Sequence, residues 1–187
     1  MKDIAKKRGS AGRKSAARGI KSARVAGNKT ANKSKATILI PENTSQEQFA
    51  WHILGEESFL PARPVSDFDL LEASLTGIKK QSIISLAKVM NIPLKDMAAL
   101  LNLSYKTLGR KKESDTFDSL VSSLSIEIAL TVAHGLTVFE DEIKFNRWLN
   151  KENRALKGQK PIELLNTPTG IKLVNQVLGR IDEGIYS

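Results

Sequence analysis

PLKDMAALLNLSYKTLGRKK, residues 93–112, is the stretch that decides the fold of this chain. Its first half carries apolar residues at helical spacing, which predicts a short amphipathic helix. Asn102 stands where that helix must stop, because asparagine tolerates the left-handed conformation just past a helix C-terminus. Ser104 is then a good N-cap for a second helix, which we expect to run from Tyr105 to about Lys112. The stretch therefore predicts two short helices joined by a tight turn.

The second of these helices is basic on its outer side, and we expect it to bury only Leu108. Two helices that cross steeply at a tight turn form a helix-turn-helix, whose second helix lies in the DNA major groove. The candidate DNA-binding residues are Ser104, Tyr105, Lys106, Thr107, Arg110 and Lys111. Lys111 stands where such motifs commonly bury an apolar residue, which favours a short or loosely anchored helix. The alternative is an ordinary helical pair with a solvated basic face.

The composition of the 187 residues, 41% hydrophobic and 5% aromatic, suits a small helical core. The chain has no cysteine, which excludes disulfides and thiolate metal sites, and its two histidines, His52 and His134, are far apart in sequence. We therefore expect neither a metal nor a cofactor. No apolar run approaches the roughly 18 residues that a membrane span needs, and no apolar signal core begins the chain. These features predict a cytoplasmic protein.

The formal net charge of +9 is concentrated at the N-terminus. Residues 1–37 hold twelve Lys and Arg against one Asp, a net charge of +11, so the other 150 residues sum to −2. This segment has too little apolar surface to fold alone, which predicts a disordered basic tail. The residues expected to contact DNA phosphates without sequence preference are Arg13, Lys14, Arg18, Lys21 and Arg24. The alternatives are a solubilising tail and an organellar transit peptide.

Residues 38–77 are predicted to be an extension with a short apolar strand or strap at 38–40 and two short helices, which we expect to pack laterally on the helical body.

Residues 78–139 contain a helix at about 79–91, the helix-turn-helix and a long helix at about 120–139. Apolar residues cover more than one face of the long helix, so it must contact something besides its own core. A homodimer seam is the favoured interpretation, because helix-turn-helix proteins bind paired half-sites. The alternative is the central core helix of a monomer.

The C-terminal block, residues 140–187, begins with a short helix at about 141–149. A one-turn helix and a last helix from Thr167-Pro168 to about Ile181 follow. An ordered set of residues runs through this block: Trp148-Leu149, Asn153, Ala155-Leu156, Gly158, Pro161, Leu164-Leu165, Gly170, Leu178, Arg180-Ile181 and Gly184. This pattern closely resembles the Xre/MbcA/ParS family of antitoxins, the partners of RES-domain toxins. The resemblance extends over about residues 78–187. Lys160 departs from it, because a Thr often stands there, and its short helix is left poorly capped.

The resemblance implies an all-α fold, with an Xre/Cro-like helix-turn-helix domain, a small helical C-terminal toxin-binding domain at 140–187 and the basic tail. It implies the antitoxin of a type II toxin–antitoxin module: a homodimer that covers the NAD-binding cleft of a RES-domain toxin that degrades NAD, and represses its own promoter. The candidate toxin-binding residues are Trp148, Asn153, Leu156, Pro161, Leu165, Arg180, Gly184, Ile185 and Tyr186. The alternative to a toxin contact is that Arg180 only interacts favourably with the helix dipole and that Tyr186 packs inside the domain.

A DNA-binding transcriptional regulator or nucleoid-associated protein with no toxin partner is the alternative function, and the basic tail favours it. An enzyme is not expected. The acids Glu140, Asp141 and Glu142 stand at a helix start, where they suit the helix dipole, and no nucleophile–base constellation or phosphate-cradling glycine loop is evident.

Overall fold

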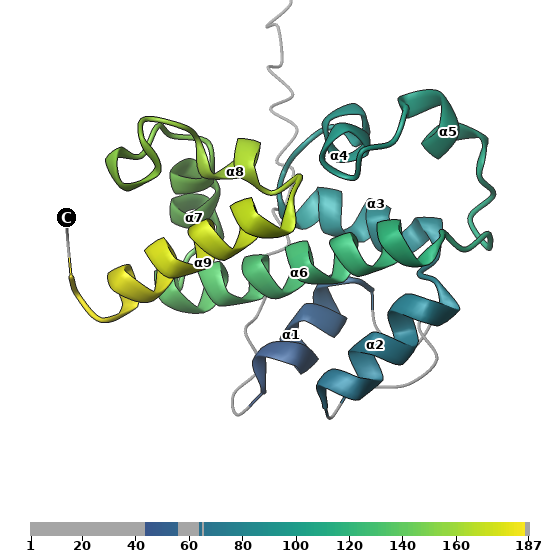
Figure 1. Ribbon diagram of the computed structural model, residues 1–187, viewed down its shortest axis with the longest axis horizontal. Coiled ribbons are helices and arrows are strands. Elements are labelled where there is room, and N and C mark those ends of the chain that lie inside the picture. Colours follow the sequence, from purple (N-terminus) through teal and green to yellow (C-terminus); the bar gives the residue numbers. More distant parts are fainter. Residues whose placement is uncertain (1–43, 56–63, 65, 186–187) are drawn as a thin grey trace, which may run out of the picture. The chain divides into compact units, whose positions relative to one another are not determined.

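The computed structural model describes residues 44–55, 64 and 66–185, and over these residues the chain is helical and has no strand (Figure 1). The elements are α1 (Gln46–Ile53), α2 (Asp67–Thr76), α3 (Lys80–Val89), α4 (Leu94–Leu100), α5 (Tyr105–Arg110), α6 (Ser119–Phe139), α7 (Glu142–Leu149), the 3-10 helix η1 (Arg154–Leu156), α8 (Pro161–Leu164) and α9 (Pro168–Asp182). The all-α expectation is confirmed. The expected tail at 1–37 and the apolar run at 38–40 lie outside the described residues.

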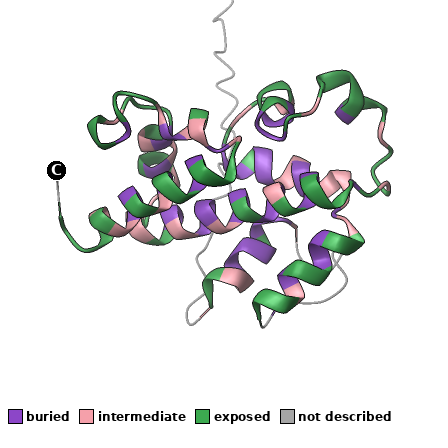
Figure 2. Cartoon of the chain, viewed as in Figure 1, coloured by how far each residue is buried: buried purple, intermediate pink, exposed green. Residues whose placement is uncertain are grey.

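Helix α6 is the centre of the fold, because α1, α2, α7 and α9 all pack against it. Figure 2 shows the burial that results along its length. Its buried residues are Val121, Ser122, Ser125, Ile126, Ile128, Ala129, Thr131, Val132, Ala133, Gly135 and Leu136. The chain therefore covers the broad apolar surface of α6 with its own helices. Helix α6 is thus a central core helix, and the breadth of its apolar surface alone does not require a dimer seam. The homodimer stays a prediction.

The length and composition of α6 also differ from expectation. It has 21 residues and a mean hydropathy of 1.4 over its most apolar window, enough by these two measures to cross a membrane. The expectation that no segment comes near this limit was wrong. Because 61% of that window is buried inside the protein, α6 has the surroundings of a core helix.

The two short helices of the extension form as expected, and both pack on α6. Ser45 caps α1 by accepting a hydrogen bond from the N–H of Gln48 (3.3 Å). The side-chain amide of Gln46 donates to the carbonyl oxygen of Leu130 in α6 (3.0 Å), so α1 is tied to α6 by a polar contact as well. At the start of α2 the Asp69 carboxylate accepts from the N–H of Ser66 (2.9 Å). The expected role of lateral packing is confirmed for α1 and α2.

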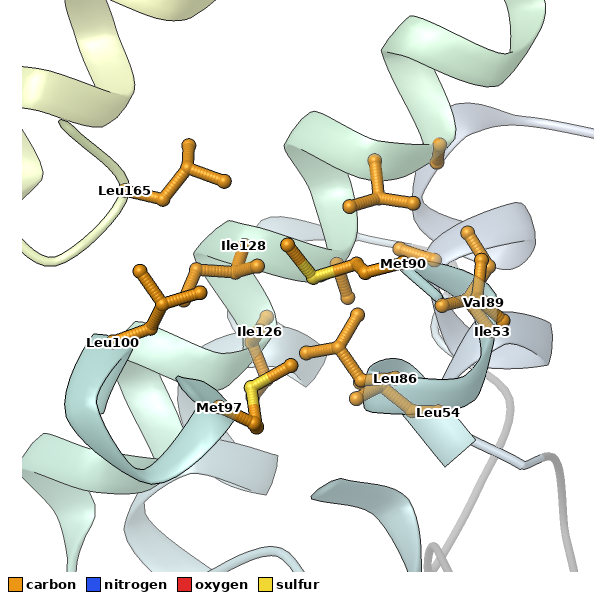
Figure 3. Close-up of a cluster of buried hydrophobic side chains, with 14 of the residues drawn as sticks. Ile53, Leu54, Leu86, Val89, Met90, Met97, Leu100, Ile126, Ile128 and Leu165 are labelled. Atoms are coloured by element: carbon orange, nitrogen blue, oxygen red, sulfur yellow. The ribbon is translucent and has the colours of Figure 1, made fainter. Parts of the chain in front are cut away.

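A single buried cluster joins the first half of the chain to the last helices. Figure 3 shows Leu86 of α3 and Met90 just after α3 beside Met97 and Leu100 of α4. Ile126 and Ile128 of α6 and Leu165 after α8 lie at the same cluster. All seven side chains are buried. The candidate DNA-binding helices and the C-terminal helices therefore rest on a common core.

The C-terminal end of α6 is built around Gly135, where a neighbouring helix approaches closely. A Cβ at Gly135 would lie 2.1 Å from Cε2 of Phe145, so the fully buried Phe145 ring of α7 lies directly on the α6 backbone. Phe139 and Trp148 flank this ring, with centroids 6.0 and 6.2 Å from that of Phe145. The aromatic cluster fixes α7 against the end of α6.

We expect Gly135→Ala to lower the free energy of unfolding by about 1–3 kcal/mol, because the added methyl overpacks a rigid aromatic contact. Gly179→Ala in α9 is the matched control. No atom lies within 4 Å of a Cβ built there, so this substitution should raise the free energy of unfolding by about 0.5–1 kcal/mol through helix propensity alone. Urea unfolding followed by circular dichroism measures both. Equal stability of the two variants would contradict the described packing of Phe145.

Candidate functional site

The first candidate surface is the pair α4 and α5 with the turn between them. Asn102 has φ 55°, in the left-handed region expected for it. The N–H of Leu103 donates to Ala98 O (2.8 Å) and that of Asn102 to Ala99 O (3.1 Å), which is the hydrogen-bond pattern of a Schellman motif. Ser104 then caps α5 by accepting from the N–H of Thr107 (2.9 Å). The local signals read from the sequence thus set both ends of the turn.

Helix α5 is shorter than expected, because it ends at Arg110 rather than near residue 112. Lys111 already has extended backbone, with φ −63° and ψ 136°. Its Nζ donates to Thr116 O (2.5 Å) and lies 5.0 Å from the centroid of the Phe117 ring, within cation–π range. Lys111 therefore turns toward the loop that leads to α6, and its ammonium is engaged inside the chain.

The other candidate DNA-binding side chains lie on the outer face of α5. Tyr105, Lys106 and Arg110 are exposed, whereas Leu108 is buried as expected. The hydroxyl groups of Ser104 and Thr107 lie 2.7 Å apart and hydrogen-bond with each other, so both are partly occupied by the cap. The structure thus brings Tyr105, Lys106 and Arg110 together on one free surface.

Two long-range contacts that the sequence did not predict hold this surface in place. Lys80 of α3 donates from Nζ to Lys111 O (2.7 Å) and Gly109 O (3.3 Å), so a cation sits at the C-terminal end of α5, where the helix dipole favours it. The Asn102 side-chain amide donates to Asn166 O (3.1 Å), in the loop before α9. Both contacts join residues more than 30 positions apart. No local sequence signal marks them.

The second candidate surface is the C-terminal block, whose elements are capped by short-range hydrogen bonds. Asp141 caps α7 by accepting from the N–H of Lys144 (2.8 Å), and this bond holds the pKa of Asp141 below its ordinary value. Thr167 caps α9 through the N–H of Gly170 (3.1 Å). Lys160 provides no side-chain cap for α8, as expected, and its ammonium lies 3.9 Å from a carboxylate oxygen of Glu163.

Several of the expected toxin-binding residues have structural roles. Leu156, Pro161 and Leu165 are buried, so their side chains shape the domain from within. Trp148 is half-buried in the aromatic cluster. Asn153 accepts from the N–H of Ala155 (2.9 Å) and organises the η1 turn. These five residues support the surface from within and are not the ones that it exposes to a partner.

The exposed candidates gather at the end of α9. Arg180 is exposed, and Ile185 exposes 54% of its surface. Gly184, at φ 71°, turns the chain there. The N–H of Ile185 donates to Arg180 O (2.8 Å) and that of Gly184 to Ile181 O (3.0 Å), a second Schellman motif. This turn fixes a cation and an apolar side chain at one helix end. Tyr186 lies outside the described residues.

The outer face of α9 continues this surface toward its N-terminal end, with residues that the sequence reading missed. Leu173 exposes 44% of its surface, and Gln176 and Arg180 follow it at spacings of three and four, on the same side of the helix. Gly179 leaves the α9 backbone open, since a Cβ there would meet nothing within 4 Å. A glycine inside a helix without an internal packing reason is the signal that could have marked this face.

A polar network holds α9 against α6 below this face. The Asn175 side-chain amide donates to Thr131 Oγ1 (2.8 Å), and its oxygen lies 3.0 Å from Nδ1 of His134. His134 is half-buried in this contact. Within the described ranges no group of three or more His, Cys, Asp and Glu residues is placed to hold a metal ion.

Comparison with known families finds a likeness for the segment that carries the second surface. Residues 134–184 match the model of the antitoxin Xre/MbcA/ParS C-terminal toxin-binding domain. No curated protein matches the chain. The matched segment begins at His134, takes in α7, η1, α8 and α9, and ends at the Gly184 turn. The C-terminal part of this chain, residues 134–184, is therefore similar to the toxin-binding domain of the Xre/MbcA/ParS antitoxins.

Proposed function

We propose that this chain is the antitoxin of a type II toxin–antitoxin module whose toxin is a RES-domain protein that degrades NAD. In this proposal the end of α9 enters the NAD-binding cleft of the toxin and blocks it. The observation that carries the proposal is that the matched domain ends at a turn with an exposed cation, Arg180, and that an exposed apolar side chain, Ile185, follows directly on the same turn. The role is binding rather than catalysis, in the cytoplasm or on the nucleoid.

The chemistry of Arg180 and Ile185 suits such a cleft. Arg180 makes no ion pair with a carboxylate of the described residues, so its guanidinium is available to a partner. A cleft that takes the phosphates and aromatic rings of NAD offers polar walls and apolar slots, and a guanidinium can both pair with carboxylates and stack on rings. The open backbone at Gly179 lets a partner approach α9 closely beside Arg180.

We further propose that α4 and α5 form a helix-turn-helix through which the chain represses its own promoter. Tyr105, Lys106 and Arg110 form one exposed face on α5, a combination suited to base edges and phosphates. Lys80 and Asn102 hold α5 and the preceding turn in fixed positions, which sequence-specific reading requires. The +11 charge of residues 1–37 would add affinity for phosphates without sequence preference.

The basic tail also favours the second candidate function, a DNA-binding regulator or nucleoid-associated protein without a toxin partner. A pull-down of the tagged chain from its own host, in high salt with nuclease, separates the two. We expect a RES-domain protein to be recovered in stoichiometric amount. Recovery of the chain alone, with DNA binding only at lower salt, would contradict the antitoxin role and support the regulator.

We expect Arg180→Ala to weaken toxin binding by about tenfold to a hundredfold, since truncation of a buried interface arginine typically costs 1–3 kcal/mol. Lys172→Ala removes an exposed cation from the same helix and is the matched control. Calorimetric titration of the toxin and growth rescue of cells that express it measure the effect. Equal loss in both variants would show that only the charge of α9 matters.

We expect Lys106→Ala with Arg110→Ala to abolish operator preference while toxin neutralisation is retained, because each base contact contributes about 1–3 kcal/mol of discrimination. The control pair is Lys144→Ala with Arg147→Ala on α7, which removes the same charge from another exposed helix. Gel-shift titrations with operator and scrambled DNA test this. Retained operator preference in the α5 pair would contradict the helix-turn-helix.

A further inference from the structure

The charges of the described chain are segregated about α6. On one side lie α1 and α2 (Figure 1), and residues 44–55 and 66–77, which include these two helices, hold four Asp and Glu but no Lys or Arg. On the other side lie α3, α4, α5, α7 and α8. Residues 79–112, from the start of α3 to just past α5, hold eight Lys and Arg against one Asp. The folded chain therefore has an acidic side and a basic side.

A second group of cations lies on the basic side, outside the helix-turn-helix. Residues 151–160, which join α7 to α8 through η1, hold four Lys and Arg against one Glu. Lys151, Arg154 and Lys157 are exposed, and no carboxylate of the described residues forms an ion pair with them. The fourth cation, Lys160, is engaged in the ion pair described above. The proposed toxin contact at the end of α9 uses none of these cations.

The turn between α7 and α8 is rigid, because Asn153 closes it from both ends. The carbonyl oxygen of Asn153 accepts from the N–H groups of Leu156 (3.0 Å) and Gly158 (2.9 Å). The N–H of Asn153 donates to Gln159 O (3.1 Å). Leu156 is also buried, so it anchors the turn on the core. We call residues 153–159 the η1 turn. A cation on such a turn loses less freedom on binding than one on a flexible loop.

Lys157 occupies a backbone position that suits other residues better. Its φ is 57°, in the left-handed region, and Gly158 follows at φ 81°. Gly and Asn adopt this region more readily than Lys does, so the backbone of the turn gives no reason for a lysine here. Residues in such conformations gather at functional sites. No atom lies within 4 Å of a Cβ built at Gly158, so a partner can approach the η1 turn closely.

We propose that Arg154 and Lys157, with Lys151 beside them, bind the phosphate backbone of the same DNA duplex that α5 reads. This inference rests on the proposed DNA binding through α5 and extends the contact to the C-terminal block. Lys and Arg that bind phosphates fix the position of a protein on a duplex but carry no sequence information. In this arrangement α5 reads the bases, and the η1 turn holds the duplex in place.

Two long-range hydrogen bonds hold the C-terminal block in a fixed position relative to the helix-turn-helix. The Asn146 side-chain amide of α7 donates to Val89 O at the end of α3 (3.2 Å). The Asn102 amide donates to Asn166 O (3.1 Å). Duplex DNA is stiff over about 150 base pairs, so a duplex held at α5 stays straight where it passes along the basic side. The η1 turn is therefore a fixed second support for that duplex.

The distribution of charge favours DNA over a protein as the partner of the η1 turn. Duplex DNA carries about one negative charge per 1.7 Å of its length, so it attracts the whole basic side of the chain. It repels the acidic side with α1 and α2, which turns α5 and the η1 turn toward the duplex together. A toxin bound at the η1 turn would need an acidic surface of its own there, apart from the cleft proposed to receive Arg180 and Ile185.

The salt dependence of DNA binding by the full chain tests this inference. The logarithm of the affinity falls with that of the salt concentration, with a slope of about −0.9 for each phosphate contact. We expect Arg154→Ala with Lys157→Gly to reduce the magnitude of this slope by about 1.8. The affinities for operator and scrambled duplexes should fall equally, by about tenfold at low salt. Fluorescence anisotropy of labelled duplexes measures both.

The design of this variant separates contact from folding and from overall charge. Glycine suits the φ of 57° at Lys157, so Lys157→Gly does not endanger the fold. Lys144→Ala with Arg147→Ala removes the same charge from exposed positions on α7 and is the matched control. The control should change the salt slope by less than half as much as the η1 variant does.

The absence of cysteine from the chain permits a second test. An iron chelate attached to the Ala155→Cys variant, at an exposed position on the η1 turn, should cleave the duplex outside the base pairs that α5 protects. The same chelate on the Ser123→Cys variant should give no cleavage, because Ser123 is exposed on α6 beside α2, on the acidic side.

An unchanged salt slope in the Arg154→Ala, Lys157→Gly variant, or equal cleavage from the two cysteine variants, would overturn the inference. Loss of toxin affinity in that variant with DNA binding unchanged would also overturn it and assign the η1 turn to the toxin. Failure of the helix-turn-helix proposal looks different. The wild-type chain would then show no preference for the operator, whereas the salt slope is measured on scrambled DNA as well.

Discussion

The burial of α6 is the constraint on which the rest of the structure depends. Helix α6 has 21 residues and fully buries Ile128, Ala129, Val132 and Ala133. It needs partners on several sides, because an apolar side chain left in water would lose roughly 1–3 kcal/mol of stabilisation. The C-terminal helices α7 and α9 cover part of this surface, and α1 and α2 cover more. The N-terminal extension therefore completes the core of the described body. It is not a separate appendage.

The same constraint makes the end of α9 a rigid platform. Phe145 packs directly on the backbone at Gly135, and Asn175 hydrogen-bonds to Thr131 and lies in polar contact with His134. These contacts fix α7 and α9 on α6 by shape and by hydrogen bonding. Binding through a surface carried by fixed helices avoids most of the ordering cost that a flexible segment would incur. The Gly184 turn extends this order to Ile185.

Local signals in the sequence predicted most of the helices and their ends. Capping side chains and left-handed stops act within four residues, so Ser104, Asn102, Thr167 and Gly184 could be read without a fold. Side-chain orientation across helices could not be read in this way. The apolar breadth of α6 was visible, and lateral packing of the extension on the helical body was expected, but the sequence did not show that α1 and α2 would cover α6 itself. The same limit concealed Lys80, whose partner Lys111 O lies 31 positions away.

The candidate site was predictable only as an ordered pattern of residue types. A motif spread over nearly 40 positions mixes residues that build a domain with residues that a partner contacts, and sequence gives both the same weight. Burial separates them: Leu156 and Leu165 belong to the core, whereas Arg180 and Ile185 face outward. The sequence did not single out Leu173 and Gly179, because only the structure shows that no other part of the described chain covers these two positions.

The two proposed binding surfaces belong to one folded body. The strength of the contacts between them limits how much binding at one surface can change the affinity of the other. The Asn102 amide donates to Asn166 O, and Leu101 and Leu165, next to these residues in sequence, belong to the same buried cluster. A neutral hydrogen bond of this kind contributes about 0.5–1.5 kcal/mol, a factor of roughly two to ten in an equilibrium. A partner that broke it could therefore change the other affinity by about tenfold at most through this contact. Larger coupling would require the common core to rearrange, and close packing resists that.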